Sequence, residues 1–424
     1  MQYIKGILDY ISVIYSNVVF VISMYFLFLS FFGLIKVKSK NKKKPTTSFA
    51  LVVAAHNEEK VISGIIDSLN RLDYPKELYD IFVIADNCTD NTARIARQCG
   101  AQVFERMDAE KRGKGYALEW MFNKLFSMKK QYDSVAVFDA DNLVSKNFLS
   151  EINNRFLDGY KVVQGYLDSK NPNDTWITAN YSISFWLSNR IFQLARANIG
   201  LSSQLGGTGF CIKTDILREL GWGATCLTED LEFTCKLVLN GYKVGWAHDA
   251  IIYDEKPLTL GQSWAQRKRW MQGFADVSSR YFFKLLKKGI KELNIVVLDC
   301  ALYSIQPIII VLLGIALVLN MYNQVVNAPE LISGVLSTLN NFNANITKVG
   351  ATGLIILQFL YNPIILVLER KLSFKILLYY ILNPIYSLTW VPISIQGMID
   401  KNKKEWSHTA HTRNIDITEL EKVN

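Results

Sequence analysis

The chain has 424 residues, of which half are hydrophobic, and a formal net charge of +9. This length allows a substantial core together with further segments. Much of the positive charge comes from lysines beside apolar runs, at 36–44 and 284–291, so it does not indicate a nucleic-acid-binding protein. The six cysteines form no Cys-x-x-Cys pair, and the four histidines do not cluster with them, which argues against a zinc site.

The first element is an apolar run at 11–35. It is longer than the core of a signal peptide, and a basic run rather than a small-residue cleavage site follows it. We therefore expect a membrane-spanning helix here, since a bilayer core requires roughly 20 apolar residues.

Three more apolar stretches follow the middle of the chain, at 293–320, 350–368 and 374–398. The loop at 321–347 contains no Lys or Arg, whereas lysines precede the second apolar stretch and follow the first. The positive-inside rule then places the middle of the chain in the cytoplasm and this loop outside. We expect a multi-pass protein of the plasma membrane whose catalytic domain is cytoplasmic.

The middle of the chain alternates strand-like and helix-like segments. This pattern predicts an α/β fold with a mostly parallel sheet that helices cover on both faces. Asn57 is a candidate N-cap for the helix that runs to Leu69. The expected strands are 49–55, 81–85, 102–104 and 134–138.

Polar residues follow three of these strands: His56 to Glu58, Asp86, and the pair Asp139 and Asp141. In open α/β sheets, ligands bind outside the carboxyl ends of the strands, so we expect these groups to converge on one rim. Alternate residues of a strand face the same way, so the Asp-x-Asp pair predicts either a cation site or a solvated strand end.

Further along, Gly113-Lys114-Gly115 opens a helix. It lacks the spacing of a P-loop, and both a plain helix start and a lysine that contacts phosphate remain open. Two aromatic-rich helical segments, near 176–194 and 262–287, fit amphipathic helices at a membrane interface as well as ordinary core faces.

Two more motifs lie between and within these segments. Thr228-Glu229-Asp230 has the composition of a helix start, with Thr228 as N-cap candidate, so capping alone explains the acids. Gln266, Arg269 and Trp270 fall on one side of a helical turn.

In their order and approximate spacing, these motifs resemble the processive family-2 inverting glycosyltransferases, the membrane synthases of cellulose, hyaluronan, chitin and poly-N-acetylglucosamine. The resemblance covers about residues 48–275 and the flanking spans. It implies a GT-A-like domain in which Mg²⁺ or Mn²⁺ is held on the diphosphate of a UDP-sugar. The roles it implies are metal ligands Asp139 and Asp141; nucleotide-sugar contacts Ala54, His56, Glu58, Asp86, Lys114, Asp139 and Arg269; catalytic Asp230, the general base, with Glu229; and acceptor contacts Gly207, Thr208, Gln266 and Trp270.

The expected activity is therefore processive synthesis of a β-glycan by transfer with inversion, coupled to movement of the growing chain across the membrane. UDP-glucose is the preferred donor, because the Thr-Glu-Asp form resembles that of glucan synthases. A poly-N-acetylglucosamine or hyaluronan-type synthase, a transferase that glycosylates a lipid phosphate once, and a non-catalytic scaffold remain alternatives. Accessory secretion proteins are left unassigned.

The C-terminal segment contains Trp406 and Arg413, similar to the tail motif of hyaluronan synthases that lies over the nucleotide, although a disordered basic tail fits equally well. Three spans after the domain place this segment outside, while contact with UDP requires it inside. Asn383-Pro384 and Pro392 leave a hairpin in the last stretch open. The expected division is an N-terminal helix with its basic flank (1–40), a glycosyltransferase domain (46–258), interface helices (259–292), transmembrane helices (293–400) and a basic tail (401–424).

Overall fold

A computed structural model describes residues 2–36, 43–224, 226–326, 360–403, 413 and 415–421. Side chains are described for these ranges except at 2–13, 317–326 and 421. The predicted external loop from 327 onward, the first ten residues of the apolar stretch at 350–368, and the tail from 404 to 412 lie outside the described residues.

The described part of the middle region forms one mixed, eight-stranded sheet in the order β3-β2-β1-β4-β7-β6-β8-β5. All four strands expected from the sequence are present, as β1 to β4. The strands are β1 (Phe49–Ala55), β2 (Tyr79–Asp86), β3 (Gln102–Arg106), β4 (Ser134–Asp139), β5 (Leu143–Val144), β6 (Val162–Ser169), β7 (Phe210–Lys213) and β8 (Val244–Asp254).

The sheet is less parallel than predicted. Strands β3, β2, β1 and β4 run parallel, but β7 lies antiparallel to both of its neighbours, β4 and β6, and β5 pairs antiparallel with β8. The regular strand–helix alternation that suggested a parallel sheet ends after β4. After β6 the chain runs through a helical segment at 176–198 and re-enters the sheet through the glycines before β7, two of which, Gly207 and Gly209, have positive φ.

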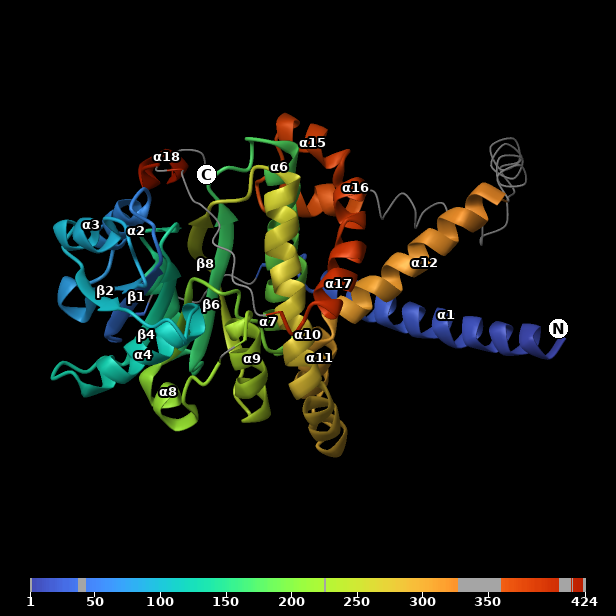
Figure 1. The fold of residues 1–424 in the computed structure, drawn as a ribbon, viewed down its shortest axis with the longest axis horizontal. Helices are drawn as coiled ribbons and strands as arrows, with labels where there is room; N and C mark the ends of the chain where they lie inside the picture. The colour runs from blue at the N-terminus through green and yellow to red at the C-terminus, as the bar shows by residue number, and fades with distance from the viewer. Residues whose placement is uncertain are drawn as a thin grey trace.

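Helices cover both faces of the sheet (Figure 1). Leu51 and Val53 of β1 face the cluster formed with α2 (Ile62–Asn70), α3 (Thr92–Gln98) and α5 (Phe148–Leu157). Val52 faces the other cluster, formed with α4 (Lys114–Ser127), α8 (Thr214–Leu220) and α9 (Glu229–Leu239). Burial on both faces explains why the central strands are continuously apolar.

The helices outside this domain lie beside it, toward the N-terminal helix (Figure 1). Helix α10 (Leu260–Lys291) runs along the domain and contacts α9, α11 and α17. The remaining elements are α1 (Gln2–Phe31), the 3₁₀ turn η1 (Lys76–Leu78), α6 (Trp176–Leu187), the π-helical segment η2 (Ser188–Leu194), α7 (Ala195–Asn198), α11 (Ile295–Ser304), α12 (Gln306–Val326), α15 (Phe374–Tyr380), α16 (Asn383–Leu388), α17 (Trp390–Ile399) and α18 (Ile417–Glu421).

Among the described helices, one is long and apolar enough to cross a membrane, with its apolar window at Ile14–Phe31. Two bent pairs also pass when each is taken as one span: Ile295–Ser304 with Gln306–Ala316, bent by 69°, and Phe374–Tyr380 with Asn383–Ile399, bent by 51°. The break in the second pair comes immediately before Asn383-Pro384, and its bend of 51° is smaller than the reversal that a hairpin would require. Membrane association is thus supported by one to three candidate spans, and a multi-pass arrangement stays a prediction.

Two buried arginines, Arg190 and Arg196, connect segments that lie far apart in the chain. Arg190 of η2 donates to the carbonyl oxygens of Gly33 and Leu34, just after α1, and bonds Glu369 Oε1 at 2.8 Å. Arg196 holds Asp299 of α11 through two hydrogen bonds of 2.8 and 2.9 Å. Removing one partner from such a pair costs about 3–5 kcal/mol, because a buried charge is left uncompensated.

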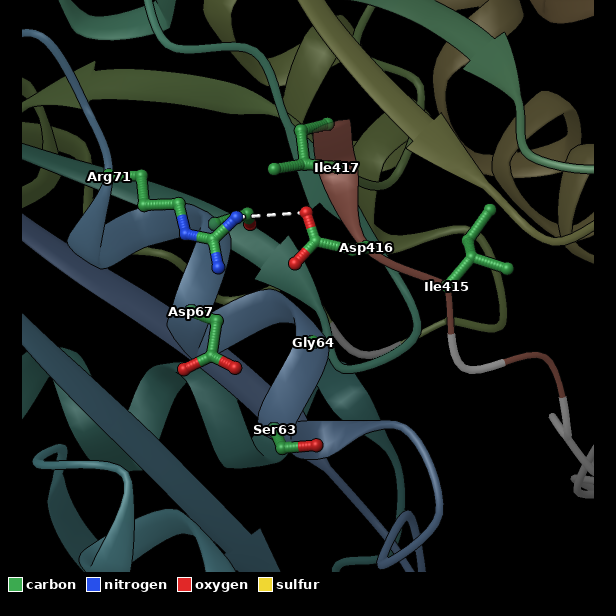
Figure 2. A pocket seen from close by; sticks show the side chains of 8 residues that line it. Ser63, Gly64, Asp67, Arg71, Ile415, Asp416 and Ile417 are labelled. Carbon is green, nitrogen blue, oxygen red and sulfur yellow. Dashed lines mark hydrogen bonds and ion pairs between the residues drawn. The ribbon is translucent and has the colours of Figure 1, made fainter. Parts of the chain in front are cut away.

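The described part of the C-terminal tail (413 and 415–421) packs on the α/β domain. Ile417 is buried with Leu143 and Tyr253, and Asp416 bonds Arg71, the residue after α2, at 2.8 Å. Figure 2 shows the small cavity, of about 230 Å³, that forms where the tail crosses α2. The described part of the tail therefore contacts the α/β domain directly, while the number of spans between them stays a prediction.

Candidate active site

The carboxyl ends of β1, β2 and β4 meet at one rim, as the sequence predicted. Ala54 of β1 lies opposite Asp139 of β4, and Ala55 lies opposite Ala85 of β2. His56 donates from Nδ1 to the carbonyl oxygen of Asp86, over 2.7 Å. Adjacent strand ends thus bring the predicted nucleotide-contacting residues together.

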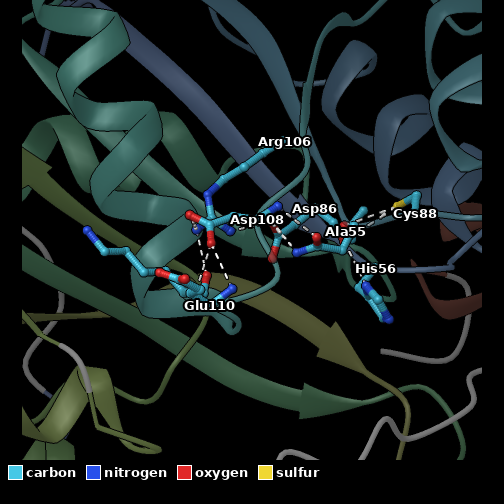
Figure 3. Close-up of polar contacts among 9 residues, drawn as sticks. Ala55, His56, Asp86, Cys88, Arg106, Asp108 and Glu110 are labelled. Carbon is cyan, nitrogen blue, oxygen red and sulfur yellow. Dashed lines mark hydrogen bonds and ion pairs between the residues drawn. The ribbon is translucent and has the colours of Figure 1, made fainter.

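Asp86 is held by an arginine that sequence reasoning missed (Figure 3). Arg106, the last residue of β3, bonds Asp86 Oδ1 at 2.6 Å, and both side chains are buried. Arg106 also bonds Asp108 Oδ2 at 3.0 Å. Burial raises the pKa of Asp86, although Arg106 opposes this effect. Arg106 closely follows the predicted strand at 102–104, and this position beside the end of the strand that carries Asp86 could have identified it from the sequence.

Asn57 does not cap α2, contrary to the prediction. It has a φ of 55°, and α2 begins at Ile62 with Val61 in the N-cap position. The side-chain oxygen of Asn57 instead accepts the N–H of Thr89 over 2.8 Å. Next to it, the buried Glu58 donates its N–H to Thr92 Oγ1 over 2.8 Å. This segment therefore joins the two loops that follow β1 and β2.

Lys114 lies at the centre of the rim. Its ammonium group pairs with Asp139 Oδ1 and donates to the carbonyl oxygen of Gly207 over 2.6 Å. Burial lowers the pKa of Lys114, but the carboxylates of Asp139 and Glu229 outweigh it, and the pKa is raised overall. The next residue, Gly115, lets the start of α4 approach the segment before α9, because a Cβ there would lie 2.4 Å from the carbonyl oxygen of Ala224 and 3.4 Å from Glu229 Cβ. The lysine is thus placed as a positive charge among three carboxylates.

Asp139 and Asp141 differ in their exposure and in their hydrogen-bond partners. The N–H of Asp139 donates to Thr208 Oγ1 over 3.1 Å, while its carboxylate is 38% exposed. Asp141 is buried and accepts the N–H of Glu255 over 3.3 Å and the side-chain amide of Asn142 over 3.3 Å. Thr208 is itself buried and donates to Asn142, so its hydroxyl positions the Asp-x-Asp turn.

The donor chemistry of this pair fits a hard divalent cation. Mg²⁺ binds through one or two carboxylates while phosphate and water oxygens supply the rest, and Asp139 offers a solvent-facing carboxylate. The described residues contain no cluster of three or more His, Cys, Asp and Glu side chains able to hold a metal alone.

Glu229 and Asp230 begin α9 at the same rim. Thr228 occupies the N-cap position, as predicted, but its side chain makes no capping hydrogen bond. Burial raises the pKa of both carboxyl groups above their ordinary values, and Lys114 opposes the rise in each. A Cβ on Gly207 would lie 3.6 Å from Asp230 Oδ2, which places the glycine loop beside this carboxylate.

Helix α10 packs directly on this segment. A Cβ on Gly273 would lie 2.4 Å from Thr228 Oγ1, so only glycine allows the approach. Two turns earlier, Gln266 accepts the hydroxyl hydrogen of Tyr181. Between them, the ring of Trp270 lies 5.9 Å from that of Tyr181. The second predicted motif thus lies next to the first, with an aromatic neighbour from α6.

The neighbouring arginines have different environments. Arg267 is buried, with its guanidinium 4.4 Å from the ring centre of Tyr386 and 4.9 Å from that of Trp390. Arg269 is half-buried and lies near enough to Tyr181 to lower the pKa of that hydroxyl, against the larger effect of burial. Arg267 therefore attaches α10 to α16 and α17, while Arg269 faces the aromatic side.

The sequence of this region matches the family model described as glycosyltransferase like family 2, over residues 45–273, which is more than half of the chain. The chain belongs to this family. It is consequently a nucleotide-sugar-dependent transferase, and the rim described above lies within the matched residues.

Among known proteins, this family-2 glycosyltransferase is similar to a β-monoglucosyldiacylglycerol synthase of Synechocystis sp., with 30% identity over 240 residues, covering 54% of the chain and 48% of that protein. It is also similar to a poly-β-1,6-N-acetyl-D-glucosamine synthase of Staphylococcus aureus, with 26% identity over 329 residues, covering 74% and 75%. The chain thus spans about half the length of the glucolipid synthases that it matches.

Among solved structures, the glycosyltransferase resembles a mannosyltransferase of Pyrobaculum calidifontis in complex with GDP-Man and Mn²⁺. The TM-score is 0.56 at 15% identity, and the match covers 93% of this chain and 98% of that one. This likeness supports the GT-A fold, including its mixed sheet.

Proposed function

We propose that the protein is a membrane-associated, inverting β-glycosyltransferase that takes a hexose from a UDP-sugar and adds it to the end of a growing glycan. The observation that carries this proposal is the meeting of Lys114, Asp139, Glu229 and Asp230 at one rim, with α10 packed against Thr228. Three carboxylates around one lysine suit a site that binds a diphosphate on one side and removes a proton on the other.

In the proposed reaction, Asp230 accepts the proton of the acceptor hydroxyl. The oxygen then bonds to the anomeric carbon as the bond from that carbon to the diphosphate breaks, and UDP leaves with the electron pair. Attack opposite the leaving group turns an α-linked donor into a β-linked product. The raised pKa of Asp230 makes it a stronger base than an ordinary aspartate.

The other rim residues would bind the donor. Asp86, His56 and the backbone from Ala54 to Glu58 form a polar edge suited to the nucleoside. Lys114 and Arg269 would hold the diphosphate as positive charges. Asp139 and Asp141 would hold Mg²⁺ or Mn²⁺, which supplies positive charge to the leaving diphosphate.

The acceptor end of the site is assigned to the aromatic surface of α10. Trp270 is half-buried against the rings of Tyr181 and Phe185, and its remaining face is flat and apolar, so a terminal sugar can stack on it. Gln266 and Gly207 border the same region. Thr208 is assigned an indirect role, because its hydroxyl is engaged with Asp139 and Asn142.

Chain elongation is the preferred outcome, because the similarity to the poly-β-1,6-N-acetyl-D-glucosamine synthase covers three quarters of both chains. For the donor we retain UDP-glucose, with UDP-N-acetylglucosamine as the second choice. The 30% identity to a glucolipid synthase favours one further candidate, transfer of a single glucose to a lipid hydroxyl.

The deciding experiment measures UDP release by the purified protein with UDP-glucose or UDP-N-acetylglucosamine, in the presence of Mg²⁺, Mn²⁺ or EDTA, followed by sizing of the product. Metal-dependent release with a high-molecular-weight product supports the synthase and names its sugar. Release that requires added diacylglycerol, with a product one sugar longer, would replace elongation by glucolipid synthesis. Absence of release with either donor in either metal would contradict the choice of donor.

Asp230→Asn tests the base separately from the donor site. The substitution keeps the shape of the side chain and removes its basicity, so donor affinity should stay within about twofold while transfer falls by about 10²–10⁴-fold. Glu219→Gln provides a matched acid-to-amide control on α8, away from the rim, where Glu219 accepts a hydrogen bond from the Tyr242 hydroxyl over 2.7 Å. A normal transfer rate in Asp230→Asn would remove it from the role of base.

A further inference from the structure

A second cavity, of about 260 Å³, lies between α4 and α8 and is here called the α4–α8 cavity (Figure 1). None of the residues that line it belongs to the rim described above. Its volume is slightly below the roughly 300–1,000 Å³ of pockets that hold drug-sized ligands. The cavity therefore admits one small molecule.

The apolar wall of the α4–α8 cavity is aromatic, since it is formed by Phe122, Phe126 and Trp222. The ring of Trp222 is packed edge-on against that of Phe122, with the ring centres 5.5 Å apart. Phe126 is half-buried and has the guanidinium of Arg218 4.8 Å from its ring centre. Aromatic side chains held in this way offer a large contact area and lose little conformational freedom when a ligand binds.

Polar groups in the wall of the same cavity lack hydrogen-bond partners. Trp222 is only 4% exposed, and its indole N–H is buried and donates no hydrogen bond in the described structure. An unpaired buried donor is unfavourable, and an acceptor on a ligand would remove that cost. Glu119 and Asn123, one turn apart on α4, add a carboxylate and an amide that have no hydrogen-bond partner among the described residues.

The chemistry of these groups identifies the class of ligand. Glu119 and Arg218 carry opposite charges, so the cavity favours a neutral molecule. Carboxylate, amide and N–H groups together provide acceptors and donors, which suits hydroxyl groups, because a hydroxyl does both. The aromatic wall suits a ring with apolar C–H faces. We propose that the α4–α8 cavity binds a neutral sugar residue of hexose size, either as a free sugar or as part of a glycan chain.

The segment 221–224 connects this cavity to the rim. Lys236 of α9 donates to the carbonyl oxygen of Gly221, which lines the cavity, over 2.9 Å. The carbonyl oxygen of Ala224 lies against the start of α4, beside Lys114. A sugar in the cavity thus contacts a segment that is held by the helix of the acidic pair and by the helix of the rim lysine. Its binding should therefore change the rate of transfer.

This proposal does not depend on the donor or on the product, so its failure would leave the proposed activity standing. The test titrates glucose, N-acetylglucosamine and a β-linked tetrasaccharide of each into the purified full-length protein, without donor or divalent cation. Saturation-transfer difference NMR measures the binding. Glu119→Gln/Asn123→Ala removes two polar partners from the cavity, and Glu77→Gln, at an exposed glutamate of η1, is the matched acid-to-amide control. Trp270→Ala separates this cavity from the acceptor surface.

We expect binding by the wild type, by Glu77→Gln and by Trp270→Ala. The double variant should bind about tenfold more weakly, because it loses two hydrogen bonds. Binding of the monosaccharides would assign the cavity to a free sugar, and binding of a tetrasaccharide alone would assign it to a glycan chain. Binding that is lost in Trp270→Ala and kept in the double variant would overturn the proposal, as would the absence of binding by all four sugars.

UDP release measures the connection between the cavity and the rim. At a fixed donor concentration, the sugar that binds should change the rate in the wild type, and the double variant should show less of this change. An equal response of both proteins would overturn the connection. Without added sugar the double variant should turn over as the wild type does, because neither substituted residue belongs to the rim. Thermal unfolding that matches the wild type confirms that the variant is folded.

Discussion

Gly273→Ala is the most direct test of how α10 positions the acidic pair. The added Cβ would lie 2.4 Å from Thr228 Oγ1 and 2.8 Å from the Thr228 backbone nitrogen. Ordinary contact begins near 3.4 Å, so α10 and the Thr228 segment must separate by about 1 Å. Overpacking of this size costs about 1–3 kcal/mol of stability, and a shift of about 1 Å at reacting groups lowers the rate by about 10²-fold.

The same helix provides the control. A Cβ on Gly261 meets nothing within 4 Å, so Gly261→Ala makes the same chemical change without the clash. The assay compares UDP release, donor affinity and thermal unfolding of the two variants. We expect Gly273→Ala to lose most of its turnover while donor affinity changes less, and Gly261→Ala to match the wild type. Equal turnover and equal stability in the two variants would refute the proposed packing of α10 on Thr228.

Three further predictions concern individual charges. Arg106→Met should lower the free energy of unfolding by about 3–5 kcal/mol, because it leaves the carboxylate of Asp86 buried without its partner. Arg97→Met, at a half-exposed ion pair, should change this free energy by less than about 1 kcal/mol. Chemical denaturation measures both variants, and equal effects would contradict the difference in burial between the two ion pairs. Asp141→Ala should weaken UDP-sugar binding in Mg²⁺ and leave the weaker binding in EDTA unchanged, as titration calorimetry would show; undiminished binding in Mg²⁺ would exclude it as a metal ligand. Burial raises the pKa of Asp230, and Asp230 acts as a base only in its carboxylate form. The value of kcat/KM should therefore fall about tenfold per pH unit below that raised pKa. A fall of kcat/KM that begins only near about pH 4, the pKa of an ordinary aspartate, would argue against Asp230 as the base.

The strands that build the rim were predictable because each is a continuous apolar run followed by polar residues. Strands β1 to β4 lie where the sequence placed them, and Asp86 and Asp139 end β2 and β4, the two strands on either side of β1. The antiparallel β7 was not predicted, because it has only four residues, Phe210–Lys213, and its place between β4 and β6 depends on pairing with strands distant in sequence.

The contacts of charged side chains were less predictable than their positions. Helical spacing correctly put Gln266 and Trp270 on one side, where both meet Tyr181. The same spacing gave no sign that Arg267 would be buried, since its aromatic partners, Tyr386 and Trp390, lie far along the chain. Similarly, Asn57 had the composition of a cap, but its side chain bonds the loop after β2. Partners distant in sequence determine where such side chains lie, and the periodicity of a segment carries no information about those partners.

The packing of α10 has a mechanical consequence. On one face, Gly273 brings it against Thr228; on the other, a Cβ on Gly397 of α17 would lie 2.4 Å from Met271 Cβ, and Lys268 pairs with Asp400. Because α10 is closely packed on both of these faces, it cannot move relative to one neighbour without displacing the other. A tilt of α17 must therefore also move the segment that contains Glu229 and Asp230. This part of the protein behaves as a rigid lever, in which α17, α10 and that segment move together.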